Sequence, residues 1–374
     1  MAFVVATGVL AMLLSSCGAS STANPHLDST DYPNEQGVRV NAVREPIWRL
    51  VGDNLAVSVN GGITWSSKQL PVGMSSMRTA VTVTRRGVLL AFTSGGDTLS
   101  VARAIDATAP WVQYLVPIKW PQGVALGPTY DPNLVTVTND LATGATAVSV
   151  NEGGAQTGNV PALFVSTHQG TSFTQLPVPT RYGNYQVAMI SPSTGIVVGG
   201  DESQGVWFTS NAGIAWKAVS LPGLVTGPAV SFFGPTAFGD VVYLPVAIGT
   251  GSSAQATLYA STDGGSSFTK VLTEARTPGG VVAVNGPNVW WFLGPHRIME
   301  SSDGGNFWKG ITALRIAGSV ASAQLISRTD AVVMTIDSSC TRFKSGCYNS
   351  AFQQATNDGG ATWYQSTFEP TKRE

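Results

Sequence analysis

Short apolar runs, rich in Val, Ile and aromatic residues, recur along the chain and are separated by Gly, Asn, Asp, Ser and Thr. The runs have the length of β-strands, and no segment keeps the 3.6-residue period of an amphipathic helix. Two stretches show the same plan of four runs in succession. Strands are predicted over residues 185–191, 195–199, 205–210 and 216–221, and again over residues 280–285, 288–293, 297–302 and 308–312. This pattern predicts an all-β protein built from four-stranded units.

One turn motif recurs between the third and fourth run of each unit. It reads Ser/Thr-x-Asp-x-Gly-x-x-Trp/Phe, with three nearly identical copies, three that keep the frame with substitutions, and one at residues 104–111 that has lost its glycines. In every copy, the residue at the Asp position precedes an aromatic residue by five. The seven pairs are Asn60 and Trp65, Asp106 and Trp111, His168 and Phe173, Asn211 and Trp216, Asp263 and Phe268, Asp303 and Trp308, and Asp358 and Trp363.

The chemistry of the motif indicates a hairpin that also joins neighbouring sheets. The Asp or Asn side chain accepts hydrogen bonds from backbone N–H groups of its own turn, and Gly takes the positive φ of a tight hairpin. The aromatic residue starts the next strand and is expected to fold between adjacent sheets. The motif resembles the Asp-box, or bacterial neuraminidase repeat, and the strand pattern around residues 195–199 also resembles the photosystem II assembly-factor propellers. These resemblances imply a fold and not an activity.

Seven boxes predict a seven-bladed β-propeller of four-stranded antiparallel blades. Residues 37–370 are expected to form this single domain, and residues 371–374 a C-terminal tail. Because the box around Asp106 is eroded, six blades plus a separate flank is the alternative. Long polar loops are predicted over residues 140–159 in the third unit and 249–256 in the fifth.

The N-terminal residues predict an exported lipoprotein. Residues 1–16 are uncharged and contain an apolar run of signal-peptide length, too short for a durable transmembrane helix. The run ends in Leu-Ser-Ser-Cys-Gly, which resembles the bacterial lipobox. This resemblance implies diacylation of Cys17, and two acyl chains are enough for stable anchoring. Residues 17–36 are small and polar, as in a flexible tether. We therefore expect a protein anchored by lipid to the bacterial cell envelope.

Composition narrows the range of partners. Of the 374 residues, 43% are hydrophobic and 11% charged, which suits a folded core and not a disordered chain. Lys plus Arg total 21 and Asp plus Glu 22, so no overall positive field favours nucleic acid. The three His residues are scattered and predict no metal site, and no motif predicts a cofactor. In an exported chain, Cys340 and Cys347 are expected to form a disulfide, between strands that end near residue 336 and start near residue 350.

The resemblance to sialidases raises the hypothesis of catalysis. Sialidases bind the substrate carboxylate with three arginines, the first in a Phe/Tyr-Arg-Ile-Pro motif, and use a Tyr nucleophile paired with Glu. The nearest stretch here is residues 43–46, where Arg44 is followed by an acid in place of Ile. No carboxylate pair outside the boxes stands out, and Asp263, Asp303 and Asp358 are expected to be occupied by their turns. The sequence favours a non-catalytic protein, and a sialidase-like glycoside hydrolase is the alternative.

A binding role fits the predicted fold, because a propeller gathers loops from every blade around its axis. Aromatic residues outside the boxes are candidates for stacking on sugars, although core packing is the default for most of them. They are Tyr130, Tyr182, Tyr185, Trp290 and Trp291. Because Trp290 and Trp291 are adjacent on a predicted strand, they face opposite sides, and at least one is expected to be buried. We expect an envelope-anchored monomer that binds a protein or glycan and no nucleic acid.

Overall fold

The structure of the chain is a computed structural model. It describes residues 47–51, 54–58, 65–74, 79–84, 87–93, 96–106, 108–122, 135–139, 145–154, 158–200, 205–224, 230–249, 254–275, 277, 279–293, 297–311, 316, 319–340 and 347–366. In these ranges every regular element longer than a turn is a β-strand, and no helix is long and apolar enough to cross a membrane.

The described strands form seven antiparallel sheets, which we number in chain order. Sheet 1 contains β1 (Ile47–Val51), β2 (Asn54–Ser58) and β3 (Ser66–Gln69). Sheet 2 contains β4 (Thr79–Thr84), β5 (Gly87–Thr93), β6 (Thr98–Ala104) and β7 (Val112–Pro117). Sheet 3 contains β8 (Val135–Asn139), β9 (Thr146–Gly154), β10 (Gly158–Ser166) and β11 (Thr174–Leu176). Sheet 4 contains β12 (Asn184–Met189), β13 (Gly195–Gly200), β14 (Gly205–Thr209) and β15 (Lys217–Val219).

The remaining three sheets complete the described part of the chain. Sheet 5 contains β16 (Val230–Phe232), β17 (Thr236–Phe238), β18 (Val241–Ile248), β19 (Gln255–Ser261) and β20 (Thr269–Ala275). Sheet 6 contains β21 (Val281–Asn285), β22 (Asn288–Phe292), β23 (Ile298–Ser301) and β24 (Lys309–Ile311). Sheet 7 contains β25 (Ser319–Leu325), β26 (Ala331–Cys340), β27 (Cys347–Thr356) and β28 (Tyr364–Ser366).

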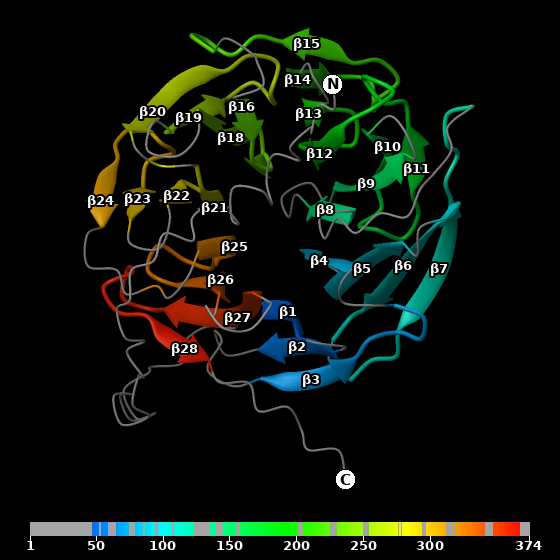
Figure 1. Cartoon of the computed structure of the whole chain (residues 1–374), viewed down its shortest axis with the longest axis horizontal. Coiled ribbons are helices and arrows are strands. Elements are labelled where there is room, and N and C mark those ends of the chain that lie inside the picture. The colour runs from blue at the N-terminus through cyan, green and yellow to red at the C-terminus, as the bar shows by residue number, and fades with distance from the viewer. Residues whose placement is uncertain are drawn as a thin grey trace.

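The sheets stand side by side around a central axis, with the first strand of each nearest the axis and the last at the periphery (Figure 1). Neighbouring sheets touch through their inner strands, as β4 does with β8, β8 with β12 and β21 with β25. Strands pair with their sequence neighbours, except that β16 and β17 both pair with β18. This is the arrangement of a β-propeller, and it confirms the predicted all-β fold with several four-stranded antiparallel sheets; sheet 1 has three described strands and sheet 5 has five.

Two local predictions are wrong. The long loop predicted over residues 140–159 is largely the hairpin of β9 and β10. In β9 small polar residues alternate with valines, so that one face of the strand packs toward each neighbouring sheet. The strand ends predicted near residues 336 and 350 are also wrong. The ladder between β26 and β27 continues until Cys340 pairs with Cys347, since the polar residues of this hairpin stay in antiparallel register.

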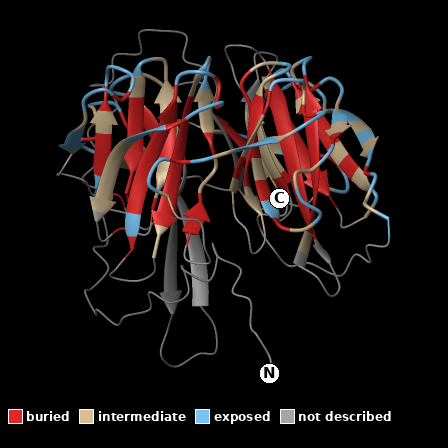
Figure 2. Cartoon of the chain, turned by 90° about the horizontal axis from the view of Figure 1, so that it is seen from above, coloured by how far each residue is buried: buried red, intermediate tan, exposed pale blue. Residues whose placement is uncertain are grey.

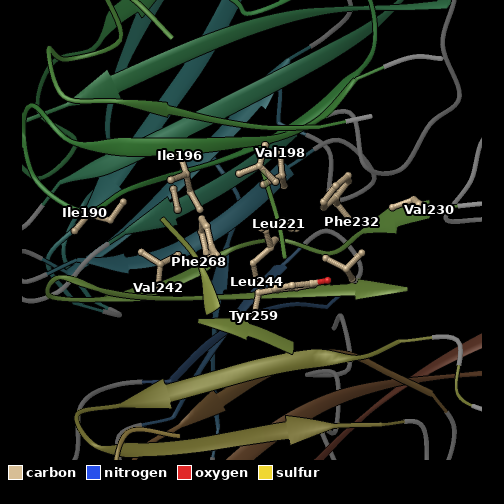
Figure 3. Packing of buried hydrophobic residues seen from close by; sticks show 13 residues of the cluster. Ile190, Ile196, Val198, Leu221, Val230, Phe232, Val242, Leu244, Tyr259 and Phe268 are labelled. Carbon is tan, nitrogen blue, oxygen red and sulfur yellow. The ribbon is translucent and has the colours of Figure 1, made fainter. Parts of the chain in front are cut away.

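The core lies between the sheets, in six clusters that each join one sheet to the next among the described residues. Alternation along each strand supplies both neighbours. On β13, Ile196 and Val198 pack toward sheet 5, whereas Val197 packs toward sheet 3. Figure 3 shows the cluster between sheets 4 and 5, and Figure 2 shows that buried residues fill the strands while exposed ones gather in the turns.

A hydroxyl at the end of the third strand organises the box turn. In sheet 5, the N–H groups of Asp263 and Gly265 donate to the Ser261 hydroxyl at 3.3 and 2.8 Å. The same hydroxyl donates to the Asp263 carboxylate at 2.7 Å, and this carboxylate accepts the Ser267 N–H at 2.9 Å. The set recurs in sheets 4, 6 and 7, around Thr209, Ser301 and Thr356. Two side chains therefore close each of these turns together.

The divergent boxes keep part of this network. In sheet 3 the Ser166 hydroxyl accepts the N–H groups of His168 and Gly170 at 3.2 and 2.9 Å. In sheet 2 the first position is Ala104, and Asp106 alone accepts the N–H groups of Thr108 and Ala109 at 2.8 and 2.7 Å. The eroded box thus still closes the turn between β6 and β7. In sheet 1, Asn60 lies outside the described residues, and Trp65 is half-buried.

Glycine at the fifth box position lets the turns of sheets 4 and 5 approach the preceding sheet. A Cβ on Gly265 would lie 2.3 Å from the Ile196 Cγ2, and one on Gly213 would lie 2.6 Å from the Leu176 Cδ1. These glycines also have φ values of 93° and 77°, in the left-handed region that other residues rarely adopt. Both the conformation and the close contact therefore require glycine.

The box aromatics pack into the seam with the preceding sheet. Phe268 is 5% exposed in the cluster between sheets 4 and 5. Trp111 and Trp216 also donate their indole N–H to the Gln69 and Pro177 carbonyls, at 2.8 and 2.7 Å, on the outer strand of the preceding sheet or just beyond it. Three further box aromatics each pack against the corresponding cluster, namely Phe173, Trp308 and Trp363. The boxes of sheets 2 to 7 therefore fasten each of these sheets to the one before it.

The turns keep the box carboxylates ionised. Desolvation opposes ionisation of Asp263, but hydrogen bonds from Ser267 and the neighbouring serines outweigh it and hold the pKa of Asp263 well below its ordinary value of 3.8. The Phe307 N–H is the main cause of the lowered pKa of Asp303. A lowered folded-state pKa means that the carboxylate stabilises the fold above the unfolded-state pKa and loses this contribution as the pH falls through the folded-state pKa.

We predict that Asp263→Ala lowers the free energy of unfolding by about 1 kcal/mol at neutral pH, a value discounted for the solvent exposure of this group. The difference from wild type should shrink as the pH falls from the unfolded-state pKa of about 4 toward the lower folded-state pKa, because the unfolded chain binds the proton before the folded one does. Urea unfolding at several pH values measures it. The control is Asp240→Ala, since Asp240 bonds the box through its backbone carbonyl. A difference that grows in acid, or an equal loss in the control, would contradict the prediction.

Candidate functional site

The two ends of the sheets differ in what their side chains are free to do. Every box lies between the last two strands of its sheet, so the boxes share one end, which we call the box face. We call the opposite end the crossover face. In the four-stranded sheets it carries the turn between the second and third strands and the connection to the next sheet. On the crossover face, linked polar residues run across sheets 2, 3 and 4. This polar cluster consists of Thr93, Asn151, Glu152, Asn159, Thr180, Arg181, Tyr182, Asn184 and Tyr185.

Asn151 joins sheets 3 and 4 at the base of the cluster. It lies near the end of β9 with 3% of its surface exposed. Its amide donates to the Tyr185 carbonyl at 3.1 Å, and its side-chain oxygen accepts the Tyr185 N–H at 2.9 Å. An amide is the side chain that can both donate to and accept from one backbone residue in this way. Asn151 therefore substitutes for a strand pairing between the two sheets.

Glu152 points to the other side of β9 and joins sheets 2 and 3. Its carboxylate accepts a hydrogen bond from the Thr93 hydroxyl at 3.2 Å, and both side chains are buried, at 1% and 0% exposure. Burial of a carboxyl group is costly unless hydrogen bonds compensate for lost hydration. A buried carboxyl at the end of a core strand is therefore a feature that packing alone does not explain.

The exposed part of the cluster presents polar groups and one aromatic ring. The Arg181 guanidinium carbon lies 5.5 Å from the Tyr182 ring centroid, and its Nη2 donates to the Gln122 carbonyl at 2.5 Å. The Asn159 amide donates to the Asn184 side-chain oxygen at 2.5 Å. The Thr180 hydroxyl bonds the Tyr182 carbonyl at 2.8 Å. These bonds fix the orientation of the groups while leaving further donors on the guanidinium, which carries five N–H groups.

The exposed groups of the cluster can donate hydrogen bonds to a ligand and accept hydrogen bonds from it. Within the described ranges, no group of three or more His, Cys, Asp or Glu residues converges to hold a metal ion. The carboxylates of Asp106, Asp263, Asp303 and Asp358 all lie on the box face and accept bonds from their own turns. A fixed guanidinium, amides and an aromatic ring are groups that bind sugar hydroxyls or peptide carbonyls.

The aromatic residues that the sequence suggested for stacking on sugars differ in how far they are exposed. Tyr185, Trp290 and Trp291 are 0%, 1% and 0% exposed, so none of them is available to stack on a sugar. The two tryptophans face opposite sides of β22, toward sheets 7 and 5, as expected from their adjacency, and both are buried. Tyr182 is half-buried beneath Arg181, and Tyr130 lies outside the described residues.

The other predicted site residues lie outside the described ranges or at their limits. Cys17 and Arg44 lie outside the described residues. Cys340 and Cys347 are directly opposite each other at the end of the ladder between β26 and β27. Their disulfide stays a prediction.

Sequence reasoning missed the polar cluster for a specific reason. It placed Asn151 and Glu152 in a loop because small polar residues and glycines follow them. The signal was present in the alternation of β9, in which Val148, Val150 and Glu152 share one face. When two polar residues such as Asn151 and Glu152 extend an alternating strand pattern, they indicate buried hydrogen bonds at the end of that strand.

The chain is similar to several solved structures at low sequence identity. No protein-family model matches the sequence, and no curated protein matches it. YCF48 from Cyanidioschyzon merolae is similar at a TM-score of 0.46 and 11% identity, over 87% of this chain and 88% of its own. The GH93 α-L-arabinofuranosidase of Fusarium graminearum, solved with arabinobiose, has a TM-score of 0.42 and 10% identity, over 71% and 89%. Protein lmo1340 from Listeria monocytogenes has a TM-score of 0.48 and 8% identity, over 91% and 99%. Likeness at this level says nothing about the activity of the present chain.

We predict that Asn151→Ala lowers the free energy of unfolding by about 2 kcal/mol, because the Tyr185 N–H and carbonyl are left buried without their partner. The matched control is Asn159→Ala, whose amide bonds Asn184 at an exposed position. It should change stability by less than about 0.5 kcal/mol. Urea unfolding followed by tryptophan fluorescence measures both. Equal losses in the two variants would show that Asn151 has no special role between sheets 3 and 4.

Proposed function

We propose that this chain is an envelope-anchored, non-catalytic propeller that binds a protein or glycan partner through the exposed part of the polar cluster. The observation that supports the proposal is the fixed group formed by Arg181 over Tyr182, with the paired amides of Asn159 and Asn184. Loops on a rigid sheet scaffold are the usual place for recognition. The boxes at the other end are occupied by turn formation and offer no comparable group.

The seven sheets are proposed to be the seven blades of one closed ring within residues 37–370. In sheet 1 the box lies between β2 and β3, which are therefore the third and fourth strands of their blade, and β1 is the second. A further strand on the axis side of β1 would complete the blade. The residues that precede β1 in the chain lie outside the described ranges.

Binding is tested with purified protein on a glycan array and on an array of peptides from bacterial envelope proteins. We predict that Arg181→Ala weakens any specific binding at least about tenfold, because the guanidinium is the central donor of the site. The control is Arg328→Ala, an exposed arginine in a turn on the box face. Its affinity should equal that of the wild type. Specific binding that survives Arg181→Ala, or that is lost in Arg328→Ala, would move the site elsewhere.

A glycoside hydrolase is the second candidate, and the buried carboxyl of Glu152 is the observation in its favour. Carboxyl groups in low-dielectric surroundings serve as proton donors in glycosidases. Hydrolysis of fluorogenic sialosides and arabinofuranosides that is abolished by Glu152→Gln would favour the enzyme. Absence of turnover together with specific binding would favour the non-catalytic proposal.

The envelope location is proposed from the lipobox-like sequence that ends at Cys17. We predict that bacteria expressing the chain incorporate labelled palmitate into it, and that Cys17→Ala abolishes the label and releases the protein from the membrane fraction. Cys340→Ala is the matched control and should keep the label. Wild-type protein without label, or label that persists in Cys17→Ala, would contradict the anchor.

A further inference from the structure

The outer strand of sheet 2 presents an apolar edge. β7 is the last strand of its sheet, so one of its edges pairs with β6 and the other has no strand beside it in the described structure. Val112 and Leu115 on this strand are 62% and 69% exposed. Ile105, in the turn that leads into β7, is 69% exposed. Three of the seven large hydrophobic residues exposed in the described structure therefore belong to this one sheet.

The other outer strands are protected against strand addition in ways that β7 is not. Four of them carry a lysine, namely Lys68 on β3, Lys217 on β15, Lys270 on β20 and Lys309 on β24. The remaining two, β11 and β28, have three residues each and are too short to pair extensively. Charged residues and short length are the usual devices that keep edge strands from pairing. β7 has six residues, VQYLVP, and no charge.

These differences favour a second copy of the chain as the partner. When two identical edge strands pair antiparallel, each side chain lies opposite a side chain of the equivalent strand in the other copy. A lysine on such a short strand would therefore lie opposite or close to the lysine of the other copy. β7 avoids this repulsion, and its leucine would meet the valine or leucine of the other copy. A symmetric pairing of this kind uses the same surface on both subunits and closes at two. An unrelated strand would gain nothing from the symmetry of an uncharged edge.

We propose that two copies of this protein associate through antiparallel pairing of their β7 strands, which joins sheet 2 of one copy to sheet 2 of the other. This dimer replaces the monomer expected from the sequence. The pairing is small compared with stable interfaces, which bury about 1,200–2,000 Å². Its dissociation constant is therefore expected to lie between about 1 µM and 1 mM.

Sedimentation velocity of the full chain in mild detergent, over a range of protein concentrations, tests the proposal. Wild type should shift from monomer to dimer as concentration rises. Leu115→Lys should raise the dissociation constant at least about tenfold, because it places like charges near each other and removes apolar contact. Thr174→Lys is the matched control, since Thr174 is an exposed residue on the outer strand β11. It should leave the dissociation constant unchanged.

A charge-swap experiment distinguishes strand pairing from a general change in solubility. Leu115→Lys and Leu115→Glu should each be more monomeric than wild type, and their equimolar mixture should recover dimer through opposite charges. Unchanged circular dichroism spectra and unfolding midpoints would show that both variants are folded. A wild type that stays monomeric at the highest concentration, equal dimerisation of Leu115→Lys, or a mixture as monomeric as its components would each overturn the proposal. A monomeric wild type that instead binds a foreign extended peptide at β7 would also overturn it.

Discussion

The structure depends on the hydrogen bonds that a Ser or Thr hydroxyl makes at the end of the strand before the box in sheets 3 to 7. In sheet 5, Ser261 accepts two backbone N–H groups and donates to Asp263, which accepts a third N–H. These bonds fix where the third strand stops and the fourth begins. They also set the direction in which Gly265 and Phe268 leave the turn, and both then contact the preceding sheet. The seam between neighbouring sheets therefore follows from one local turn.

This dependence separates the two faces of the molecule. On the box face the polar side chains are engaged with their own backbone, so their chemistry is structural. On the crossover face the connections between sheets vary in length and composition, and Asn151, Glu152 and Arg181 make contacts that link neighbouring sheets or segments. A side chain there can change without breaking a turn. Recognition is therefore best supported on the crossover face, where the scaffold is rigid and the surface is variable.

Most of the fold could be predicted from the sequence because two features repeat along the chain. They are the box motif and the set of apolar runs between successive boxes. The strands expected over residues 185–221 and 280–312 match β12–β15 and β21–β24 closely. The hairpin of β9 and β10 was missed because Asn and Gly suggest a loop unless alternation is followed through them. The polar cluster was beyond prediction for another reason. Asn151 and Tyr185 are 34 positions apart, and only the packing of two sheets brings them together.

The contacts of each box point backward along the chain. Trp111 reaches Gln69, Trp216 reaches Pro177, and Gly265 lies against Ile196, so each of these three turns rests on a sheet that precedes it in the sequence. A chain that emerges from its N-terminus, as during synthesis or translocation across a membrane, would therefore find each docking surface already formed when the next sheet arrives. The polarity of the turns thus gives sheets 2 to 7 an order of assembly in which each docks on a sheet that has already been made.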